Sequence, residues 1–467
     1  MTIPMTIDGR PVVTRKTLSV VDPATGKVAA EAPACAPEEL GAAVEAAARA
    51  FAPWAARSLE ERAAFVGRCG DVLAEHAEEI AALLTMEQGK PLAQARAEAE
   101  LSASWFGDTA ALRLGVEPLV DDGTASVTMR RVPRGVVAAI APFNFPLILS
   151  VCKIAPALLA GNTVVVKPSP LTPLATLRMV EVLAKALPAG VLNAVSGSAE
   201  LGPALTRHPK VDLISFTGSV AVGRAIAATA GLRRVVLELG GNDPAIVLPG
   251  ADLEAVAPEL FARSLVNSGQ FCAAIKRVYV PRRNHAELVE QLGEFARRAR
   301  LGDGLDPSTE YGPLTAGEHV PRVAAMVEEA VRDGARVVAQ SEVPVGGGHF
   351  HPVTVVSDLP PASRLEREEQ FAPVIPVLAY DDTASAIRAA NVTEYGLGAS
   401  LWGDPDLAEG LAAQVDAGTV WINTHGDLRH DVPFGGSRDS GLGVEYGYWG
   451  LLEYTRIAVT HRAGPGR

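Results

Sequence analysis

Cysteine is scarce in this chain, which has four in 467 residues. No two of them form a CxxC pair, and no histidine and cysteine spacing is typical of a zinc site, so no metal is expected. Unpaired thiols are usual in a reducing compartment. The first residues, MTIPMTIDGRPVV, lack a basic region followed by an apolar core, so we expect no signal peptide. These features predict a cytoplasmic protein.

The sequence also has no local cluster of basic residues. The net charge is −12, only 21% of the residues are charged, and the basic residues are scattered. Nucleic-acid binding usually needs a basic patch, so no nucleic-acid partner is expected. Hydrophobic residues make up 48% of the chain, which is typical of a folded protein. A chain of this length predicts about two or three domains.

A long uncharged run covers residues 135–152, GVVAAIAPFNFPLILSVC, and is nearly long enough to cross a bilayer. Pro142, Asn144 and Pro146 would break a helix near its middle, and Lys153 follows closely. A buried strand, a turn and a buried helix therefore fit this run better than a membrane span. No membrane partner is expected.

The order of the expected elements predicts an α/β fold. Residues 37–114 have helical spacing of apolar residues, and Asp-Asp-Gly between extended segments predicts a hairpin over 115–133. From residue 135 to about 240, apolar strands alternate with helices, and a second alternating block runs from about 243 to 440. Such alternation predicts parallel sheets covered on both faces. The segment after Tyr454, TRIAVTHR, alternates like an exposed strand that can pair with another chain.

The stretch FTGSVAVGR, residues 216–224, predicts a turn from strand to helix bracketed by Gly218 and Gly223. Backbone N–H groups at such a turn can approach a phosphate. The stretch is not a P-loop, because Arg224 and Ala225 stand where that loop needs Lys and Ser or Thr. On these residues alone, nucleotide binding and a plain turn are equally good interpretations.

Four polar residues stand within or next to apolar segments, and each has an ordinary alternative. Lys167 in VVVKPSP suits a ribose or a phosphate, or is a solvated lysine. Glu238 in LELGG suits a general base, because burial raises a carboxyl pKa, or is half of an ion pair. Asn144 in PFNFP suits an oxyanion hole or a turn. Glu369 in EEQFAPV suits sugar hydroxyls or an exposed helix end. The lone Cys272 in NSGQFC is a packing residue or a nucleophile.

The order of these motifs along almost the whole chain resembles that of the NAD(P)-dependent aldehyde dehydrogenase superfamily. The motifs are PFNFP, VVVKPS, FTGS, LELGG, NSGQFC, EEQFAPV, Asn423 and PFGGSRDSG. The resemblance implies a Rossmann-type cofactor domain over 1–114 and 134–240 and a catalytic domain over 241–440. It also implies a small β oligomerisation arm over 115–133 and 441–467, which would build a homodimer or homotetramer.

The resemblance also implies the catalytic roles. Cys272 would be the nucleophile and Glu238 the general base that activates water to hydrolyse the thioester. Asn144 and the backbone N–H of Cys272 would hold the oxyanion of the thiohemiacetal. Lys153 and Glu445 would belong to a proton relay around Glu238. No metal is needed for this oxidation of an aldehyde to a carboxylic acid.

For the cofactor, the resemblance places Lys167 at the adenosine ribose, Ser219 at the pyrophosphate, Glu369 at the nicotinamide ribose and Phe371 beside the nicotinamide. The family often has Glu two residues after the Pro of KPS, and this chain has Pro170 there. The carboxylate that would repel a 2′-phosphate is therefore missing, so NADP stays open as the cofactor. NAD is still the cofactor that we favour. The full predicted set is Lys167, Ser169, Gly218, Ser219, Gly223, Leu239, Glu369 and Phe371.

The expected substrate tunnel is mostly apolar, which favours a medium aliphatic or an aromatic aldehyde. Arg429 leaves open a carboxylated semialdehyde, and His425 leaves open a hydrogen bond to a polar substrate. The predicted lining is Phe145, Ile148, Leu149, Cys152, Phe271, His425, Leu428 and Arg429.

Other activities fit the sequence less well. A CoA-acylating relative commonly lacks the base, which Glu238 supplies here, and a reductase of acyl phosphates would not need the full hydrolytic set. A cysteine hydrolase would need a histidine partner, and no histidine stands in a comparable motif. A non-catalytic relative that only binds the dinucleotide is disfavoured, because Cys272, Glu238 and Asn144 are all present.

Overall fold

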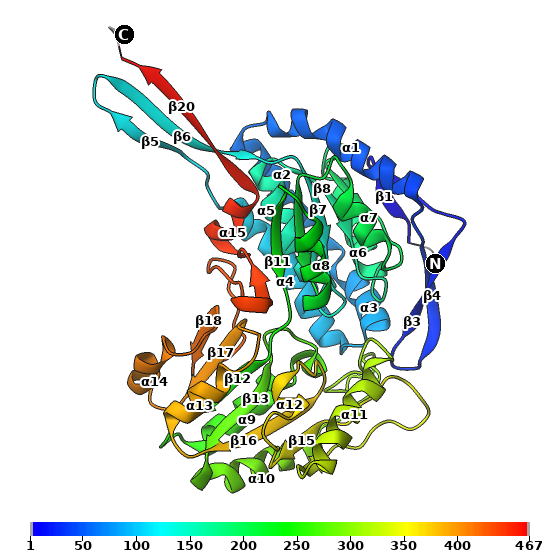
Figure 1. Cartoon of the computed structure of the whole chain (residues 1–467). Coiled ribbons are helices and arrows are strands. Elements are labelled where there is room, and N and C mark those ends of the chain that lie inside the picture. Colours follow the sequence, from blue (N-terminus) through cyan, green and yellow to red (C-terminus); the bar gives the residue numbers. More distant parts are fainter. Residues whose placement is uncertain (1–2, 465–467) are drawn as a thin grey trace.

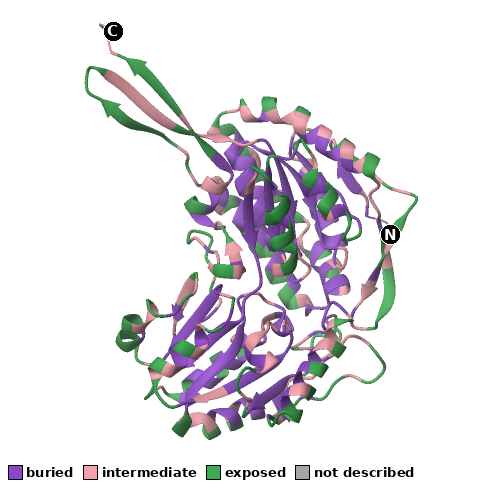
Figure 2. Cartoon of the chain, in the orientation of Figure 1, coloured by how far each residue is buried: buried purple, intermediate pink, exposed green. Residues whose placement is uncertain are grey.

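A computed structural model describes residues 3–464 of the chain (Figure 1). A sheet of eight strands lies above a sheet of seven in Figure 1, and a sheet of three strands projects from the upper half. Figure 2 shows that the two large sheets are buried, whereas exposed residues lie on the outer faces of the helices. The predicted α/β fold with two largely parallel sheets is confirmed.

The helical segment 37–114 folds as predicted and covers one side of the upper sheet (Figure 1). Ser58 caps the second of its helices by accepting a hydrogen bond from the Glu61 N–H. Gly89, with φ +96°, ends the third helix, because this left-handed conformation suits glycine. The helices are α1 (Pro37–Ala55), α2 (Leu59–Glu75), α3 (Ala77–Gln88) and α4 (Leu92–Ala110).

The upper sheet has parallel strands at its centre, and helices join them in the predicted order. The strands are β7 (Val136–Ile140), β8 (Thr163–Lys167), β9 (Leu192–Ala194), β10 (Leu213–Thr217) and β11 (Arg234–Glu238). The helices between them are α5 (Pro146–Ala160), α6 (Leu174–Ala184), α7 (Leu201–Arg207) and α8 (Val220–Thr229). In register, Ile140 lies beside Lys167, and Thr217 beside Glu238. The predicted functional residues Lys167 and Glu238 therefore end strands on one edge of the sheet.

The N-terminal strands were not predicted. β1 (Met5–Ile7) and β2 (Arg10–Val12) extend the upper sheet next to β9, and β3 (Thr17–Asp22) pairs with β4 (Lys27–Pro33) in a separate hairpin. These segments are short, and the hairpin is largely exposed. They therefore lack the continuous apolar runs that predicted the central strands.

The lower sheet has the strand order β14-β15-β16-β13-β12-β17-β18, and only β14 runs antiparallel to its neighbour. Its strands are β12 (Asp243–Val247), β13 (Ile275–Pro281), β14 (Arg336–Gln340), β15 (Thr354–Ser357), β16 (Val374–Tyr380), β17 (Gly398–Trp402) and β18 (Thr419–Ile422). β15 and β17 were not predicted. The helices of this half are α9 (Leu253–Ser264), η1 (Val266–Gly269), α10 (Arg282–Arg298), α11 (His319–Arg332), α12 (Arg364–Arg367), α13 (Thr383–Ala390) and α14 (Pro405–Ala412).

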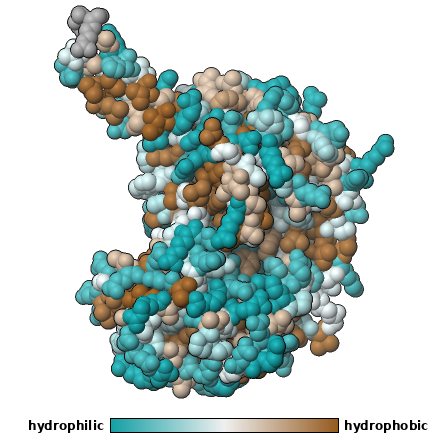
Figure 3. All heavy atoms as spheres, in the orientation of Figure 1, coloured by the Kyte–Doolittle hydropathy of each residue, from teal (hydrophilic) through white to brown (hydrophobic). Residues whose placement is uncertain are grey.

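The projecting sheet is the predicted arm. Its strands are β5 (Val116–Asp121), β6 (Ala125–Pro133) and β20 (Thr455–Ala463), in the order β20-β6-β5. The side chain of Asp122 closes the hairpin by accepting hydrogen bonds from the N–H groups of Thr124 and Ala125, 2.9 and 3.0 Å long. In Figure 3, apolar residues gather on this arm.

Residues 441–453 lie elsewhere than predicted, because they pack on the upper sheet and not in the arm. β19 (Gly441–Leu442) pairs with β11, and α15 (Gly447–Glu453) packs against α5, while η2 (Arg438–Ser440) precedes them. This placement brings Glu445 next to the carboxyl edge of the sheet.

The long uncharged run over 135–152 forms β7, a turn and the start of α5, as expected. Among the described residues 3–464, no helix has both the length and the apolar character that a bilayer span requires.

Candidate active site

A cavity of about 810 Å³ follows the carboxyl edge of the upper sheet and reaches Cys272. The surface in Figure 3 is hollowed between the two halves of the molecule. Ligands bind parallel sheets at this edge, because the strands end there and the connecting loops leave a crevice. Most of the predicted cofactor residues line the cavity: Lys167, Ser169, Gly218, Ser219, Leu239, Glu369 and Phe371.

Gly223 differs from its prediction, because it does not line this cavity. It lies on α8, where an added Cβ would approach Leu239 Cδ2 to 2.5 Å and Leu239 Cγ to 3.2 Å. The glycine therefore lets α8 pack closely on the segment after β11. Its effect on a cofactor is indirect, through the position of the helix.

One end of the cavity offers positive charge and free backbone donors. Lys167 is buried at the end of β8, its ammonium donates to the Pro168 carbonyl oxygen over 3.1 Å, and burial lowers its pKa to about 8. Ser219 caps α8, whose first residues line the cavity. The N–H groups at a helix N-terminus have no partner within the helix and bind phosphates well. This end suits an adenosine ribose and a pyrophosphate.

A carboxylate lies nearer to Cys272. Glu369 Oε1 accepts from the Gly241 N–H over 3.3 Å and lies 3.7 Å from the Lys276 ammonium. Burial raises the pKa of Glu369 to about 7. Its two oxygens suit the hydroxyls of a second ribose, and Phe371 lies close by with its ring edge-to-face against Phe143. The residues present therefore fit a nicotinamide dinucleotide along the whole cavity.

Cys272 follows a tight loop whose residues explain the NSGQ motif. Asn267 and Ser268 have φ of 51° and 57°, and Gly269 lets the loop approach Ala372, because a Cβ there would lie 2.3 Å from the Ala372 carbonyl oxygen. The amide of Gln270 donates to the Pro313 carbonyl over 3.2 Å and accepts from the Thr315 N–H over 2.9 Å. The loop is thus fixed before Cys272 begins the turn into β13.

The surroundings of Cys272 keep the thiol protonated in the absence of ligand. Burial raises its pKa to about 12, Lys276 opposes this rise, and the carboxylates of Glu369, Asp243 and Glu238 add to it. The thiolate is the reactive form of cysteine. A positive charge arriving beside Cys272 therefore has a large effect on its reactivity.

Asn144 points its amide at the nucleophile loop. Its Nδ2 donates to the Gln270 carbonyl oxygen over 3.0 Å, and an amide has a second N–H to offer. The backbone carbonyl oxygen of Asn144 accepts hydrogen bonds from Lys90 Nζ over 2.8 Å and from Asn267 Nδ2 over 3.0 Å. Lys90, which sequence analysis did not single out, is fully buried and pairs with Glu98 over 2.5 Å.

Glu238 lies buried at the end of β11, and neither carboxylate oxygen has a hydrogen-bond partner among the described residues. Burial raises its pKa well above the usual range, the charge of Glu445 adds to the rise, and Lys153 opposes it. Lys153 Nζ donates to Glu445 Oε1 over 2.5 Å and to Thr217 Oγ1 over 2.7 Å. The three groups of the predicted relay therefore lie together, at the end of β10 and β11.

The apolar residues predicted for the substrate tunnel mostly lie together. Ile148, Leu149 and Cys152 are buried on α5. The Phe145 and Phe271 rings meet edge-to-face with centroids 5.4 Å apart. Phe145, Phe271, Cys272 and Leu428 pack against the same core of the upper half.

Sequence analysis missed an aromatic cluster beside this tunnel. Tyr446 stacks on Phe434 with ring centroids 5.8 Å apart, and meets Trp105 edge-to-face at 5.1 Å. Trp105 comes from α4, and Phe434 and Tyr446 come from the segment after residue 433. The one sequence signal for this cluster is that Tyr446 directly follows Glu445.

Two polar residues predicted for the tunnel point elsewhere. His425 is fully buried, with Nδ1 2.9 Å from Ser400 Oγ and Nε2 3.6 Å from Asp243 Oδ2. This burial inside the lower half does not agree with a substrate contact. Arg429 is exposed and forms two hydrogen bonds of 2.9 Å to Asp431, so its charge is already compensated.

Similarity to known proteins extends over almost the whole chain. Residues 12–460 match the model of the aldehyde dehydrogenase family. The chain belongs to that family. The predicted family is therefore confirmed, and the chain is an NAD(P)-dependent aldehyde dehydrogenase.

The dehydrogenase is 39% identical over 461 residues to the phenylacetaldehyde dehydrogenase of Pseudomonas fluorescens, a match that covers 94% of this chain and 91% of that protein. It is 37% identical over 464 residues to the betaine aldehyde dehydrogenase of Cereibacter sphaeroides, covering 97% and 95%. The solved structure of betaine aldehyde dehydrogenase from Staphylococcus aureus in complex with NAD+ has a TM-score of 0.96 and 30% identity, covering 100% of this chain and 96% of that chain.

Proposed function

We propose that the dehydrogenase oxidises aldehydes with Cys272 as nucleophile, Asn144 as oxyanion donor and Glu238 as general base. The observation that carries this assignment is their convergence. Cys272 and Asn144 line the same cavity, and Glu238 lies close enough to Cys272 to act on the pKa of its thiol. A nucleophile, an oxyanion donor and a base at the end of a dinucleotide cavity are the parts that this oxidation needs.

The steps follow from these positions. Cys272 gives its proton to solvent water and Sγ attacks the carbonyl carbon of the aldehyde. The oxygen that becomes negative accepts hydrogen bonds from Asn144 Nδ2 and from the Cys272 N–H, and such donors typically speed the step about 10²–10³-fold each. NAD(P), when bound, supplies the acceptor for the hydride that leaves this carbon, and a thioester remains. Glu238 then takes a proton from water, which attacks the thioester, so that the C–S bond breaks and the acid and the Cys272 thiolate are released.

Lys153 and Glu445 would carry that proton away from Glu238. Their direct bond and the contact of Lys153 with Thr217 form a buried polar path beside the base. A buried carboxyl that has accepted a proton needs such a path before it can act again.

We infer that the substrate is an apolar, and preferably aromatic, aldehyde. Phe145 and Phe271 support this inference, as do the nearby rings of Trp105, Phe434 and Tyr446, since aromatic rings pack well edge-to-face. The similarity to a phenylacetaldehyde dehydrogenase points the same way. A quaternary ammonium aldehyde is the second candidate, because the same rings favour a cation and a betaine aldehyde dehydrogenase is similar. A carboxylated semialdehyde fits less well, since Asp431 compensates Arg429.

The experiment is dinucleotide reduction by the purified dehydrogenase with phenylacetaldehyde, hexanal, betaine aldehyde and succinic semialdehyde, with and without CoA. We expect reduction without CoA, fastest with phenylacetaldehyde. A strict requirement for CoA would contradict hydrolysis by Glu238. Fastest reduction with succinic semialdehyde would contradict the apolar tunnel.

NAD is the cofactor we expect to be preferred, with NADP also accepted. Pro170 and Lys167 both line the cavity. The carboxylate among the lining residues is that of Glu369, which lies at the Cys272 end, because Lys276 contacts both residues. Among the described residues that line the adenosine end, none carries a carboxylate that would repel a 2′-phosphate, so NADP can also bind. We predict that Pro170→Glu lowers kcat/KM with NADP by about tenfold or more through like-charge repulsion, and affects NAD much less. Equal losses with the two cofactors would show that this end does not read the ribose.

We also infer that copies of the chain assemble into a homodimer or homotetramer through the arm. The exposed apolar residues of β5 and β20 support this inference, because an exposed strand edge with apolar side chains favours pairing.

A reducing, cytoplasmic setting is inferred from the thiols. All four cysteines are free, and burial raises the pKa of Cys35 and Cys69 to about 12. Such thiols suit a compartment in which disulfides are not formed.

A further inference from the structure

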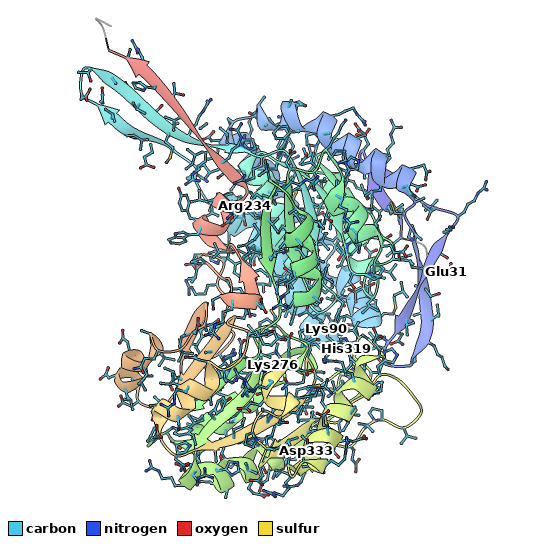
Figure 4. All side chains as sticks on the ribbon, in the orientation of Figure 1. Glu31, Lys90, Arg234, Lys276, His319 and Asp333 are labelled. Atoms are coloured by element: carbon cyan, nitrogen blue, oxygen red, sulfur yellow. The ribbon has the colours of Figure 1, made fainter. Side chains whose placement is uncertain are left out.

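Lys276 is a buried lysine beside the nucleophile to which the mechanism above gives no role. It lies on β13, the strand that follows Cys272, and is 1% exposed. Figure 4 labels it at the edge of the lower half that faces the upper half, near Lys90. A buried ammonium is costly unless its neighbours compensate it, so its contacts are informative.

The ammonium of Lys276 is bonded to the backbone of the nucleophile itself. Its Nζ donates to the Phe271 carbonyl oxygen over 2.5 Å and lies 3.4 Å from the Cys272 carbonyl oxygen. The Ala274 N–H donates to the same Phe271 oxygen over 3.1 Å. The Phe271 carbonyl is therefore held by two donors, one of them charged.

That carbonyl belongs to the same peptide group as the Cys272 N–H. No peptide bond of the described chain is cis, so the N–H points away from the carbonyl and from Lys276. The Cys272 N–H donates to no described residue, which leaves it available for a substrate oxygen. A cation on the carbonyl side also polarises the peptide, and hydrogen bonds in such a chain strengthen one another.

Lys276 is also the cation among the groups that act on the Cys272 thiol. The carboxylates of Glu369, Asp243 and Glu238 all oppose the thiolate, whereas Lys276 favours it. Glu369 shares this cation, since its Oε1 lies 3.7 Å from Nζ. The balance of charge at the nucleophile therefore depends on one side chain.

We propose that Lys276 is a positioning residue for the nucleophile, which aims the Cys272 N–H at the substrate oxygen and supplies the positive charge that stabilises the Cys272 thiolate. The proposal rests on the proposed role of Cys272. The opposing explanation is that Lys276 serves only as the buried partner of Glu369.

The test is the rate at which iodoacetamide alkylates Cys272 in the dehydrogenase without cofactor, measured over a range of pH and followed by mass spectrometry at that residue. We expect Lys276→Met to lower the rate at every neutral pH by about three- to tenfold. The thiolate fraction falls about tenfold for each unit by which the pKa rises, and the greater nucleophilicity of a more basic thiolate offsets part of the loss. Lys276→Arg keeps the charge and should restore most of the rate.

Lys276→Gln separates the two effects, because glutamine can still donate to the Phe271 carbonyl but carries no charge. We expect it to alkylate as slowly as Lys276→Met, yet to reduce NAD in the first turnover faster than Lys276→Met does. The control is Lys210→Met, which removes a lysine from an exposed ion pair with Glu45, away from the residues that line the cavity. Its alkylation rate should equal that of the unaltered protein.

If Lys276→Met does not fold because Glu369 is left unpaired, the same comparison is made in a Glu369→Gln background, where both charges of the pair are gone. The proposal is overturned if Lys276→Met is alkylated at the same rate as the unaltered protein. In the second background, it is overturned if the protein with both substitutions is alkylated at the same rate as the Glu369→Gln protein. Alkylation needs neither aldehyde nor cofactor, so its result is independent of whether the proposed aldehyde oxidation is found.

Discussion

Cys272 shows how little a reactive residue reveals of itself in the sequence. Its burial and its carboxylate neighbours raise the pKa of the thiol, and Lys276 opposes this rise. Burial and charge are properties of the folded neighbourhood, and they decide whether a cysteine packs or reacts.

At Asn144, we predict that substitution by alanine lowers kcat by about 10²–10³-fold, because one of two oxyanion donors is lost in the transition state. The steady-state rate of dinucleotide reduction measures the effect. Cofactor binding, followed by the fluorescence of reduced nicotinamide, should not change, since Asn144 lies at the Cys272 end of the cavity. Ordinary turnover by a folded Asn144→Ala enzyme would contradict the assignment.

Cys272, Glu238 and Asn144 could be singled out from the sequence because their motifs are ordered as in a known family, and their catalytic roles stay predictions. Lys90 and Lys276 could not, because a lysine in a sequence gives no sign that its ammonium is buried on a backbone carbonyl. The opposite error arose at His425, a histidine that looked available and is buried against Ser400.

The elements that build the site are the ends of β7, β8, β10 and β11 and the first turn of α8. Parallel pairing brings their carboxyl ends to one edge, so residues far apart in the sequence line one cavity. The first turn of α8 is the site we propose for a pyrophosphate, and Gly223 lets α8 pack closely on Leu239.

We predict that Gly223→Val weakens dinucleotide binding by about tenfold and destabilises the fold by about 1–3 kcal/mol, because the new side chain overpacks against Leu239. Titration of cofactor fluorescence and thermal unfolding measure the two effects. The control is Gly202→Ala on α7, which lines the cavity and has open space at its Cβ. Unchanged cofactor affinity in Gly223→Val would show that the position of α8 is not critical.

The elements themselves were predicted well where apolar runs are continuous and poorly where they are not. The strands β7, β8, β10 and β11 are built mostly of apolar residues and lie in the block that was predicted to alternate between strands and helices. β17, GASLW, begins with small residues that suggest a loop, yet Gly398 is needed because an added Cβ would lie 2.4 Å from Asp243 Oδ2 and 2.6 Å from the Trp421 ring. Such close packing of elements is a tertiary property that no local pattern shows.

On the scale of the whole molecule, the residues proposed for catalysis and cofactor binding come from both halves. Glu238 and Asn144 belong to the upper sheet and its loops, whereas Cys272 and Glu369 belong to the lower half, and the cavity lies along the boundary. The arm stands apart from this boundary (Figure 1). Its exposed apolar residues therefore need an explanation other than the site.

For the arm, we predict that Ile457→Lys combined with Val459→Lys shifts the protein to a smaller oligomer, because charge then replaces apolar side chains that are 54% and 57% exposed in the single chain. Light scattering after size-exclusion chromatography measures the mass. The matched control is Val345→Lys, an exposed valine outside the arm. An unchanged mass for the arm variant would place the interface elsewhere.

In the proposed mechanism, Cys272 forms a thioester, and Glu238 then activates the water that hydrolyses it. Rapid-mixing measurement of reduced cofactor in the Glu238→Gln enzyme tests these two steps directly. The account predicts a burst of about one equivalent per active site, followed by turnover slowed about 10²-fold or more through loss of the base. Cys272→Ala should give no burst. A Glu238→Gln enzyme that shows no burst while still binding cofactor, or that turns over at the ordinary rate, would contradict the account.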